Sequence, residues 1–401
     1  MAKPEIRLKG FKGEWEDMPL YDCMEISNDR NSSNQYGKEQ VLSVSDDFGV
    51  VNQIKFLGRS YAGKDLSNYK IVRPNQVIYT KSPLKAKPYG IIKNSTTEGV
   101  VSVLYAVYNV KENICADFVN WYFTPGYRTN NYLLPLINKG AKNTINVTDA
   151  MALSGSIYIP KIEEQKSISS YLESLDSMIQ GVTKKIASLK QMKQACLVSM
   201  FPQAGETKPR VRFKGFKGEW GKNKAGNLFM TFNERNRPDL PVLSANQDIR
   251  GMAPRTDTGY NISHNKANEV TYKVVKPGQY VIHLRSFQGG FAHSSVEGIT
   301  SPAYTVFGFK DAERHDDYFW KIIFMSKEFI KSLETITYGI RDGRSISFSE
   351  FAEMNFYFPS KEEQQQIASF FTSLDKQISL QEARLEKLKQ IKAACLDKMF
   401  V

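Results

Sequence analysis

The sequence has few cysteines and no long apolar run. The four cysteines, Cys23, Cys115, Cys196 and Cys395, lie far apart and form no C-x-x-C pair, so neither a disulfide framework nor a zinc site is expected. No apolar run reaches the roughly 18 residues that a membrane-spanning helix needs. The N-terminal residues MAKPEIRLKG are charged and precede no apolar stretch, which argues against secretion. We therefore expect a cytoplasmic protein with reduced thiols.

The sequence also lacks familiar catalytic patterns. GRSYAGKD at 58–65 has the spacing of a phosphate-binding loop, but Asp65 stands where a Ser or Thr must reach magnesium. The four histidines are not spaced as metal ligands. No N-P-P-[YF] tetrapeptide, which holds a flipped base in amino-methyltransferases, occurs. We expect a non-catalytic chain that binds no metal or cofactor of its own.

The composition is that of a folded, basic protein. Hydrophobic residues make up 41% of the chain and aromatic residues 12%, which is enough to build apolar cores. With 401 residues the chain is longer than a single core usually supports, so two or more domains are expected. The 54 Lys and Arg residues against 42 Asp and Glu give a net charge of +12. This excess favours a polyanionic partner such as nucleic acid.

The sequence repeats itself. RLKGFKGEW at 7–15 returns as RFKGFKGEW at 212–220, and residues 160–201 align without gaps to 359–400 with 19 identities in 42 positions. Fainter matches lie between, including YKIVRPNQVIY at 69–79 with YKVVKPGQYVI at 272–282, and Asp117 and Trp121 with Asp316 and Trp320. Each half is therefore predicted to be one module followed by a long helix.

The repeat gives provisional boundaries and a role for the nine-residue segment. We expect its aromatic residues to seat a helix end against the next module; these residues are Phe11, Trp15, Phe216 and Trp220. The predicted divisions are an N-terminal docking segment at 1–15, a first module at 16–159, a helix at 160–202, a linker at 203–220, a second module at 221–358 and a second helix at 359–401.

Periodicity predicts mixed modules. Short runs rich in Val, Ile, Tyr and Phe and bounded by Gly, Pro or Asn are typical of strands; they lie at 102–110, 155–160, 279–284 and 355–359. Helices are expected at 117–125 and 316–336. The predicted fold class is α+β, with two mixed α/β modules related by pseudo-two-fold symmetry.

The two long helices carry an apolar seam. Its residues alternate spacings of three and four, which is typical of a coiled coil. Because the seam is longer than one module is wide, we expect the two helices to pair, and the chain order makes that pair antiparallel. The seam includes Ile168, Leu172, Leu175, Ile179, Leu189, Ile367, Phe371, Leu374, Ile378 and Leu388.

Four loops are candidates for contacting DNA, at 79–90 and 138–146 in the first half and at 284–295 and 338–346 in the second. They combine Gly with Arg, Lys, Gln and Asn, which can contact phosphates and base edges; any one of them could equally be a solvated basic turn. The candidate residues are Lys81, Lys85, Lys87, Tyr89, Lys142, Asn143, Arg285, Ser286, Gln288, Arg341 and Arg344.

The whole chain resembles the specificity subunit of Type I restriction-modification systems. The resemblance rests on the order module, helix, module, helix, with P-x-x-E-E-Q opening each helix and L-K-Q-x-K near its end. It implies that 16–159 and 221–358 are target recognition domains, each reading one half of a bipartite asymmetric DNA site, and that the helices are spacers. Two modification subunits and the restriction subunits are the implied partners. Adenine N6 methylation and cleavage, with S-adenosylmethionine, ATP and Mg, are then expected on those partner chains.

Two alternatives stay open at this point. The chain could serve a Type IIB-like assembly, in which one partner chain both methylates and cuts. It could instead be a coiled-coil adaptor for another polyanion such as RNA, which equal binding to any duplex, or a preference for single strands, would favour.

Overall fold

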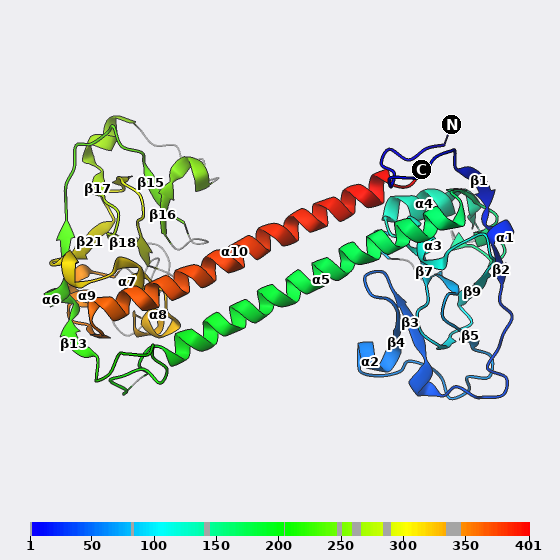
Figure 1. The fold of residues 1–401 in the computed structure, drawn as a ribbon, viewed down its shortest axis with the longest axis horizontal. Coiled ribbons are helices and arrows are strands. Elements are labelled where there is room, and N and C mark those ends of the chain that lie inside the picture. Colours follow the sequence, from blue (N-terminus) through cyan, green and yellow to red (C-terminus); the bar gives the residue numbers. More distant parts are fainter. Residues whose placement is uncertain are drawn as a thin grey trace. The chain divides into compact units, whose positions relative to one another are not determined.

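The computed structural model describes residues 2–81, 84–139, 145–203, 205–246, 251–258, 266–283, 290–333 and 346–401. Its contacts divide the chain into two units, Met1–Lys184 with Ala383–Val401, and Lys185–Glu382. Each unit holds one module, the adjoining part of one long helix and the far end of the other (Figure 1). This division cuts both long helices, whereas the boundaries expected from the sequence fall at their ends; those boundaries stay a prediction.

Unit 1 is built on an antiparallel sheet in the order β2-β9-β6-β7. The strands of this sheet are β2 (Met24–Ile26), β9 (Tyr105–Val110), β6 (Val77–Thr80) and β7 (Ile91–Asn94). Four antiparallel pairs surround it: β1 (Glu16–Pro19) with β12 (Ser156–Ile159), β3 (Leu42–Ser45) with β4 (Gly49–Asn52), β5 (Lys70–Val72) with β8 (Gly99–Val101), and β10 (Asn138–Lys139) with β11 (Ile145–Asn146). The module's α-helices are α1 (Leu20–Cys23), α2 (Gln53–Leu57), α3 (Ala116–Tyr122) and α4 (Gly126–Leu133).

Unit 2 repeats this plan with a larger sheet, in the order β14-β21-β18-β19-β16-β15. Its strands are β14 (Phe229–Phe232), β21 (Thr305–Phe309), β18 (Tyr280–Ile282), β19 (Phe291–His293), β16 (Gly251–Pro254) and β15 (Leu243–Asn246). Two antiparallel pairs accompany it: β13 (Gly221–Lys224) with β22 (Asn355–Phe358), and β17 (Lys273–Val275) with β20 (Gly298–Thr300). The module's α-helices are α6 (Ala225–Leu228), α7 (Asp317–Phe324), α8 (Lys327–Leu333) and α9 (Phe348–Ala352).

The central strands are covered on both faces. In β6, Val77 and Tyr79 belong to the core that includes α3, whereas Ile78 packs with Leu42 of β3 and Val72 of β5. In unit 2, Tyr280 and Val281 of β18 likewise enter different cores. Because successive side chains of a strand point to opposite faces, a core on each face explains why these strands are continuously apolar.

The long helices α5 (Ile162–Ser199) and α10 (Lys361–Lys398) have 38 residues each and run antiparallel within each unit. In unit 1, Tyr171 contacts Cys395 and Asp176 pairs with Lys392. In unit 2, Lys190 pairs with Glu382 and Lys193 with Asp375. Residue numbers fall along α10 as they rise along α5, which fixes the direction. The ten seam residues are all buried or partly buried. Within the described part of the chain, no helix is both long and apolar enough to cross a bilayer.

The helix predicted at 316–336 is wrong in one respect, because its described part forms two helices. α7 ends at Phe324, and α8 begins at Lys327. Between them, the Ser326 hydroxyl accepts a hydrogen bond from the Phe329 backbone N–H at 3.1 Å. A serine in this position caps a new helix N-terminus. The turn directs both Phe324 and Phe329 into the core of unit 2.

The internal repeat is shifted by two positions in this helix. In the structure Phe118 of α3 corresponds to Phe319 of α7, because both lie against a tryptophan of the repeated segment. The sequence match of Asp117 with Asp316 and of Trp121 with Trp320 is therefore out of register. The identical residues align in sequence but not in the structure, because both modules retain the buried phenylalanine ring at this point.

Candidate nucleic-acid interface

An arginine–glutamate pair holds the repeated segment in each unit. Arg7 donates from Nε and Nη2 to Glu164, both at 2.7 Å, and Arg212 donates in the same way to Glu363, both at 2.6 Å. The third contact is repeated too, because Nη1 of Arg7 donates to the carbonyl of Gly13 and that of Arg212 to the carbonyl of Gly218, each at 2.6 Å. Such two-pronged pairs are strong and geometrically specific.

The glutamine that follows each glutamate ties the long helix to its module. Gln165 accepts from the Cys115 backbone N–H at 2.9 Å, and Gln364 accepts from that of Asp316 at 3.0 Å. Each glutamine also donates to the carbonyl of the proline that precedes its helix, at 2.9 Å. Both are fully buried. The P-x-x-E-E-Q pattern therefore encodes two tertiary connections.

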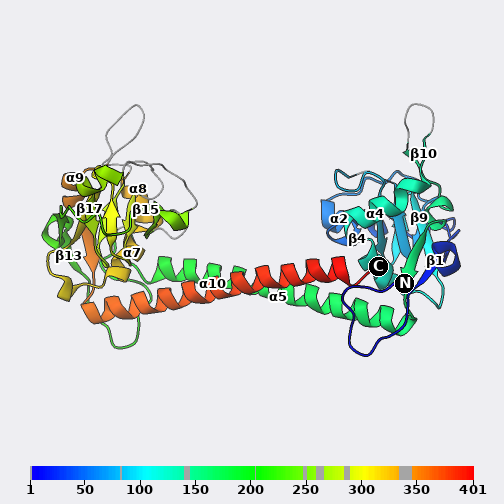
Figure 2. The ribbon, with the colours of Figure 1, turned by 90° about the horizontal axis from the view of Figure 1, so that it is seen from above.

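The far end of each helix is enclosed by the same segment. The Ile6 N–H donates to the carbonyl of Lys398, and the Val211 N–H to that of Ser199, each at 2.9 Å. In unit 1 the two chain ends accordingly lie together in both views (Figures 1 and 2). Trp15 and Trp220 are buried beside Phe118 and Phe319. Phe11 and Phe216 are only half-buried, so the tryptophans provide the anchor.

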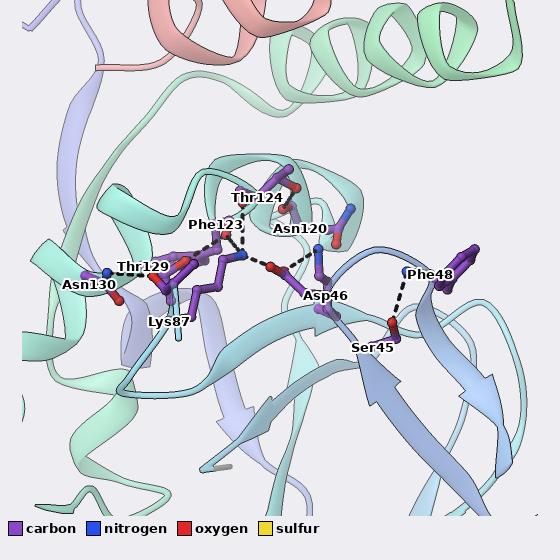
Figure 3. A network of polar contacts seen from close by, with 11 residues as sticks. Ser45, Asp46, Phe48, Lys87, Asn120, Phe123, Thr124, Thr129 and Asn130 are labelled. Atoms are coloured by element: carbon purple, nitrogen blue, oxygen red, sulfur yellow. Dashed lines mark hydrogen bonds and ion pairs between the residues drawn. The ribbon is translucent and has the colours of Figure 1, made fainter. Parts of the chain in front are cut away.

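Lys87, predicted to contact DNA, instead serves the structure. Its side chain is buried, and Nζ donates to Asp46 Oδ1 at 2.6 Å and to the carbonyls of Phe123 and Thr124 at 3.1 and 2.9 Å (Figure 3). These three bonds use all three ammonium protons. The chain folds back here because Gly90, with φ of +112°, allows an approach to the Thr80 carbonyl that a Cβ atom would block.

A second buried lysine shares the same carboxylate. Lys93 Nζ lies 3.5 Å from Asp46 Oδ1, and burial, together with repulsion from Lys87, lowers the pKa of Lys93. One carboxylate thus faces two buried amines, and the cluster is positively charged when both are protonated. It joins the tip of the β3–β4 hairpin to the loop at 84–90 and to the end of α3.

The other predicted contacts of this loop are more accessible. Lys81 lies 3.2 Å from Asp149, Lys85 is exposed, and Tyr89 is half-buried with its carbonyl accepting from the Tyr79 hydroxyl at 2.7 Å. The remaining candidates fall outside the described residues; they are Lys142, Asn143, Arg285, Ser286, Gln288, Arg341 and Arg344. Their role stays a prediction.

The second module has a polar contact at the matching strand end. His293 Nε2 of β19 lies 2.6 Å from Asp317 Oδ2 in the first turn of α7. In unit 1, Asn94 of β7 donates to Asp117 in the first turn of α3. An aspartate therefore connects strand to helix in both modules, but an imidazole replaces an amide. The strand position is equivalent, whereas Asp117 is the second residue of α3 and Asp317 the first residue of α7.

The comparisons with known proteins agree with this repeated plan. Residues 218–390 match the family described as Type I restriction modification DNA specificity domain. That range begins in the linker, includes the second module and reaches well into α10. Residues 218–390 therefore belong to the Type I DNA specificity-domain family, and the first half of the chain repeats their plan.

Three solved structures are similar to this chain over nearly all of its length. The S subunit of a Type-I restriction-modification system from M. genitalium has 10% identity and a TM-score of 0.56, over 100% of this chain and 99% of that one. The HsdS subunit from Thermoanaerobacter tengcongensis has 15% identity and a TM-score of 0.48, over 100% and 98%. A structure concerning complex assembly and conformational transition of the type I R-M system has 16% identity and a TM-score of 0.46, over 96% and 97%.

Proposed function

We propose that this chain directs a Type I restriction-modification complex to a bipartite, asymmetric DNA site. Each module reads one half of the site, and the chain itself performs no catalysis. Two modification subunits methylate adenine N6 and the restriction subunits cleave, so S-adenosylmethionine, ATP and Mg are bound by those partners. The observation that carries the proposal is the family match of the second half, together with the same buried connections in the first.

The difference between the modules supports an asymmetric site. After the second strand of each hairpin, the Gln53 N–H donates to the carbonyl of Val41 and the Arg255 N–H to that of Val242, each at 2.9 Å. The backbone is therefore equivalent, but one module places an amide there and the other a guanidinium. The Gln53 amide accepts from Ser60 and Tyr61, whereas Arg255 donates to Ser244. The segment that follows the hairpin is therefore held differently in the two modules, so two different half-sites are expected.

A module exchange tests the proposal. Residues 221–358 would be replaced by the corresponding module of another specificity subunit, and methylated adenines would be mapped across the genome of a host that carries the modification subunit. We expect one half of the recognised site to change and the other to persist. An unchanged motif, or methylation that does not depend on this chain, would refute the proposal.

Binding of purified complex to duplex DNA provides a second measurement. Release of counterions from neutralised phosphates should make the logarithm of the affinity fall linearly with the logarithm of salt concentration, with a slope of about −0.9 per phosphate contact. A matched duplex with both half-sites scrambled serves as the control. Equal affinity for the two duplexes would contradict sequence recognition.

A further inference from the structure

An exposed aromatic surface follows the β3–β4 hairpin in unit 1. Phe48 at the hairpin tip is 67% exposed and Phe56 of α2 is 43% exposed, and their rings lie 5.2 Å apart. Leu57 and Tyr61 are 46% and 62% exposed. We call these four residues and Arg59 the hairpin surface. Phe48 and Phe56 thus form an exposed aromatic pair, and exposed apolar groups of this kind are typical of interaction sites.

The hairpin surface is held rigidly from beneath. Gln53 Oε1 accepts from the Ser60 hydroxyl at 3.0 Å and from the Tyr61 backbone N–H at 2.7 Å, while its Nε2 donates to the Ser43 hydroxyl at 3.0 Å. Asn52 caps α2 by accepting from the Lys55 N–H at 3.0 Å. A surface ordered before binding loses less conformational entropy when a ligand arrives.

The surroundings of the hairpin surface are positively charged. Residues 46–64 and 84–93 together carry six cationic side chains against Asp46 and Asp47, a balance of +4. Asp46 is already engaged by Lys87 and Lys93. Figure 3 shows Phe48 directed away from that cluster. The Arg59 guanidinium lies over the Tyr61 ring at 4.6 Å. Cations beside aromatic rings match the phosphates, sugars and bases of nucleic acid.

The second module is built differently at this point. Where unit 1 has the helix α2, unit 2 has a short 3-10 turn at Arg255–Thr258, and Arg255 Nε donates to the Ser244 hydroxyl at 3.2 Å. Ser244 corresponds to Ser43 by its place in the hairpin. The supporting serine is thus retained while the residues above it differ. Among the described residues, this segment therefore differs between the two modules, which fits a role in reading one half-site.

We propose that the hairpin surface contacts duplex DNA and helps to select the half-site read by the first module. Arg59 neutralises a phosphate, and Phe48, Phe56 and Tyr61 pack against sugars and base edges. The inference rests on the proposed function and names a surface, 46–64, that lies outside the four loops expected from the sequence. It also explains why Lys87 is buried, since that lysine fixes the hairpin beside the loop at 84–90.

The test uses the full chain in complex with its modification subunit and compares Phe48→Ala, Tyr61→Ala and Arg59→Ala. The control is Tyr21→Ala, because Tyr21 is 54% exposed and belongs to α1, across the module from α2 (Figures 1 and 2). We expect each aromatic variant to weaken binding to the cognate duplex by about tenfold. Arg59→Ala should lower the salt slope by about one, and Arg59→Lys should restore it.

The outcomes separate this inference from the proposed function. If the unmodified complex prefers its cognate duplex while the three variants bind within about twofold of it, as Tyr21→Ala is expected to do, the hairpin surface does not contact DNA. If the unmodified complex shows no preference, the proposed function itself fails. Thermal melting identifies a misfolded variant, and Phe48→Ser, at the most exposed ring, then repeats the test. Loss of discrimination confined to one half-site supports the inference.

Discussion

The arginine–glutamate pair of the linker yields a quantitative prediction for Arg212→Ala. The Glu363 side chain is 1% exposed and that of Arg212 17%, so the substitution leaves a buried carboxylate without its cation. Breaking a buried pair in this way costs about 3–5 kcal/mol. Because Arg212 keeps some contact with solvent, we expect the lower end, about 3 kcal/mol of lost unfolding free energy in unit 2.

Arg210→Ala is a matched control from the same linker. Arg210 also pairs with a glutamate, Glu206, at 3.0 Å, but its side chain is 62% exposed. Exposed pairs contribute roughly 0.2–1 kcal/mol, so this variant should lose less than about 1 kcal/mol. Urea unfolding followed by the fluorescence of Trp220, which is buried beside the pair's segment, measures both.

A double variant distinguishes the loss of the ion pair from the cost of burying an unpaired charge. Arg212→Met with Glu363→Gln removes both charges, and we expect it to be more stable than Arg212→Ala because no unpaired charge is buried. The buried pair does not hold the linker in place if Arg212→Ala is no less stable than Arg210→Ala. The same conclusion follows if the double variant loses as much unfolding free energy as Arg212→Met and Glu363→Gln lose together as single variants.

Three further predictions concern single side chains. Lys87→Met takes the ammonium donor from Asp46 and from the Thr124 carbonyl, while the Phe123 carbonyl keeps its bond from the Thr129 hydroxyl. The variant should cost about 2–3 kcal/mol in urea unfolding, whereas a loss below about 0.5 kcal/mol would show that Lys93 substitutes for Lys87. Ser326→Ala removes the cap of α8 and should cost about 1 kcal/mol, with faster hydrogen exchange at the start of α8 and not of α7. Burial lowers the pKa of His315, which stacks on Phe309 at 4.8 Å; its stabilisation is therefore present above the unfolded pKa of about 6.5 and is lost as the pH falls through its folded pKa. His315→Phe should flatten the stability of unit 2 below about pH 6.5, and an unchanged pH profile would exclude His315 as its source.

Much of the fold could be predicted because its signals are local. The strands expected at 155–160 and 355–359 are present as β12 and β22, since alternating apolar residues bounded by Gly or Pro suffice to indicate them. The long helices were equally clear from their seam. The sequence does not predict the break between α7 and α8, because the apolar residues of 316–336 keep a helical period across it. Only Ser326, a residue suited to capping a helix N-terminus, indicates the turn.

The site was harder to predict because its contacts are distant in sequence. Arg7 and Glu164 are 157 positions apart. Periodicity detects only pairs that are close in sequence, so it cannot reveal this contact. Lys87 was expected to face DNA from its place in a Gly- and Pro-bounded basic loop, yet its ammonium finds Asp46 and two carbonyls that no local pattern announces. The aromatic residues of the hairpin surface resemble core residues in sequence, and only their exposure distinguishes them.

The repeat itself separates conserved support from variable recognition. Glu164 and Glu363 are identical because each is buried with an arginine, and a change on either side leaves a charge unpaired. Gln53 and Arg255 occupy equivalent backbone positions and differ, because the backbone bond to Val41 or Val242 does not depend on the side chain. Recognition can therefore change at the segment after the hairpin without loss of the connections that hold helix and module together. On this reasoning, substitutions at the exposed side chains of the hairpin surface should alter binding before they alter stability, and substitutions at the arginine–glutamate pairs should do the reverse.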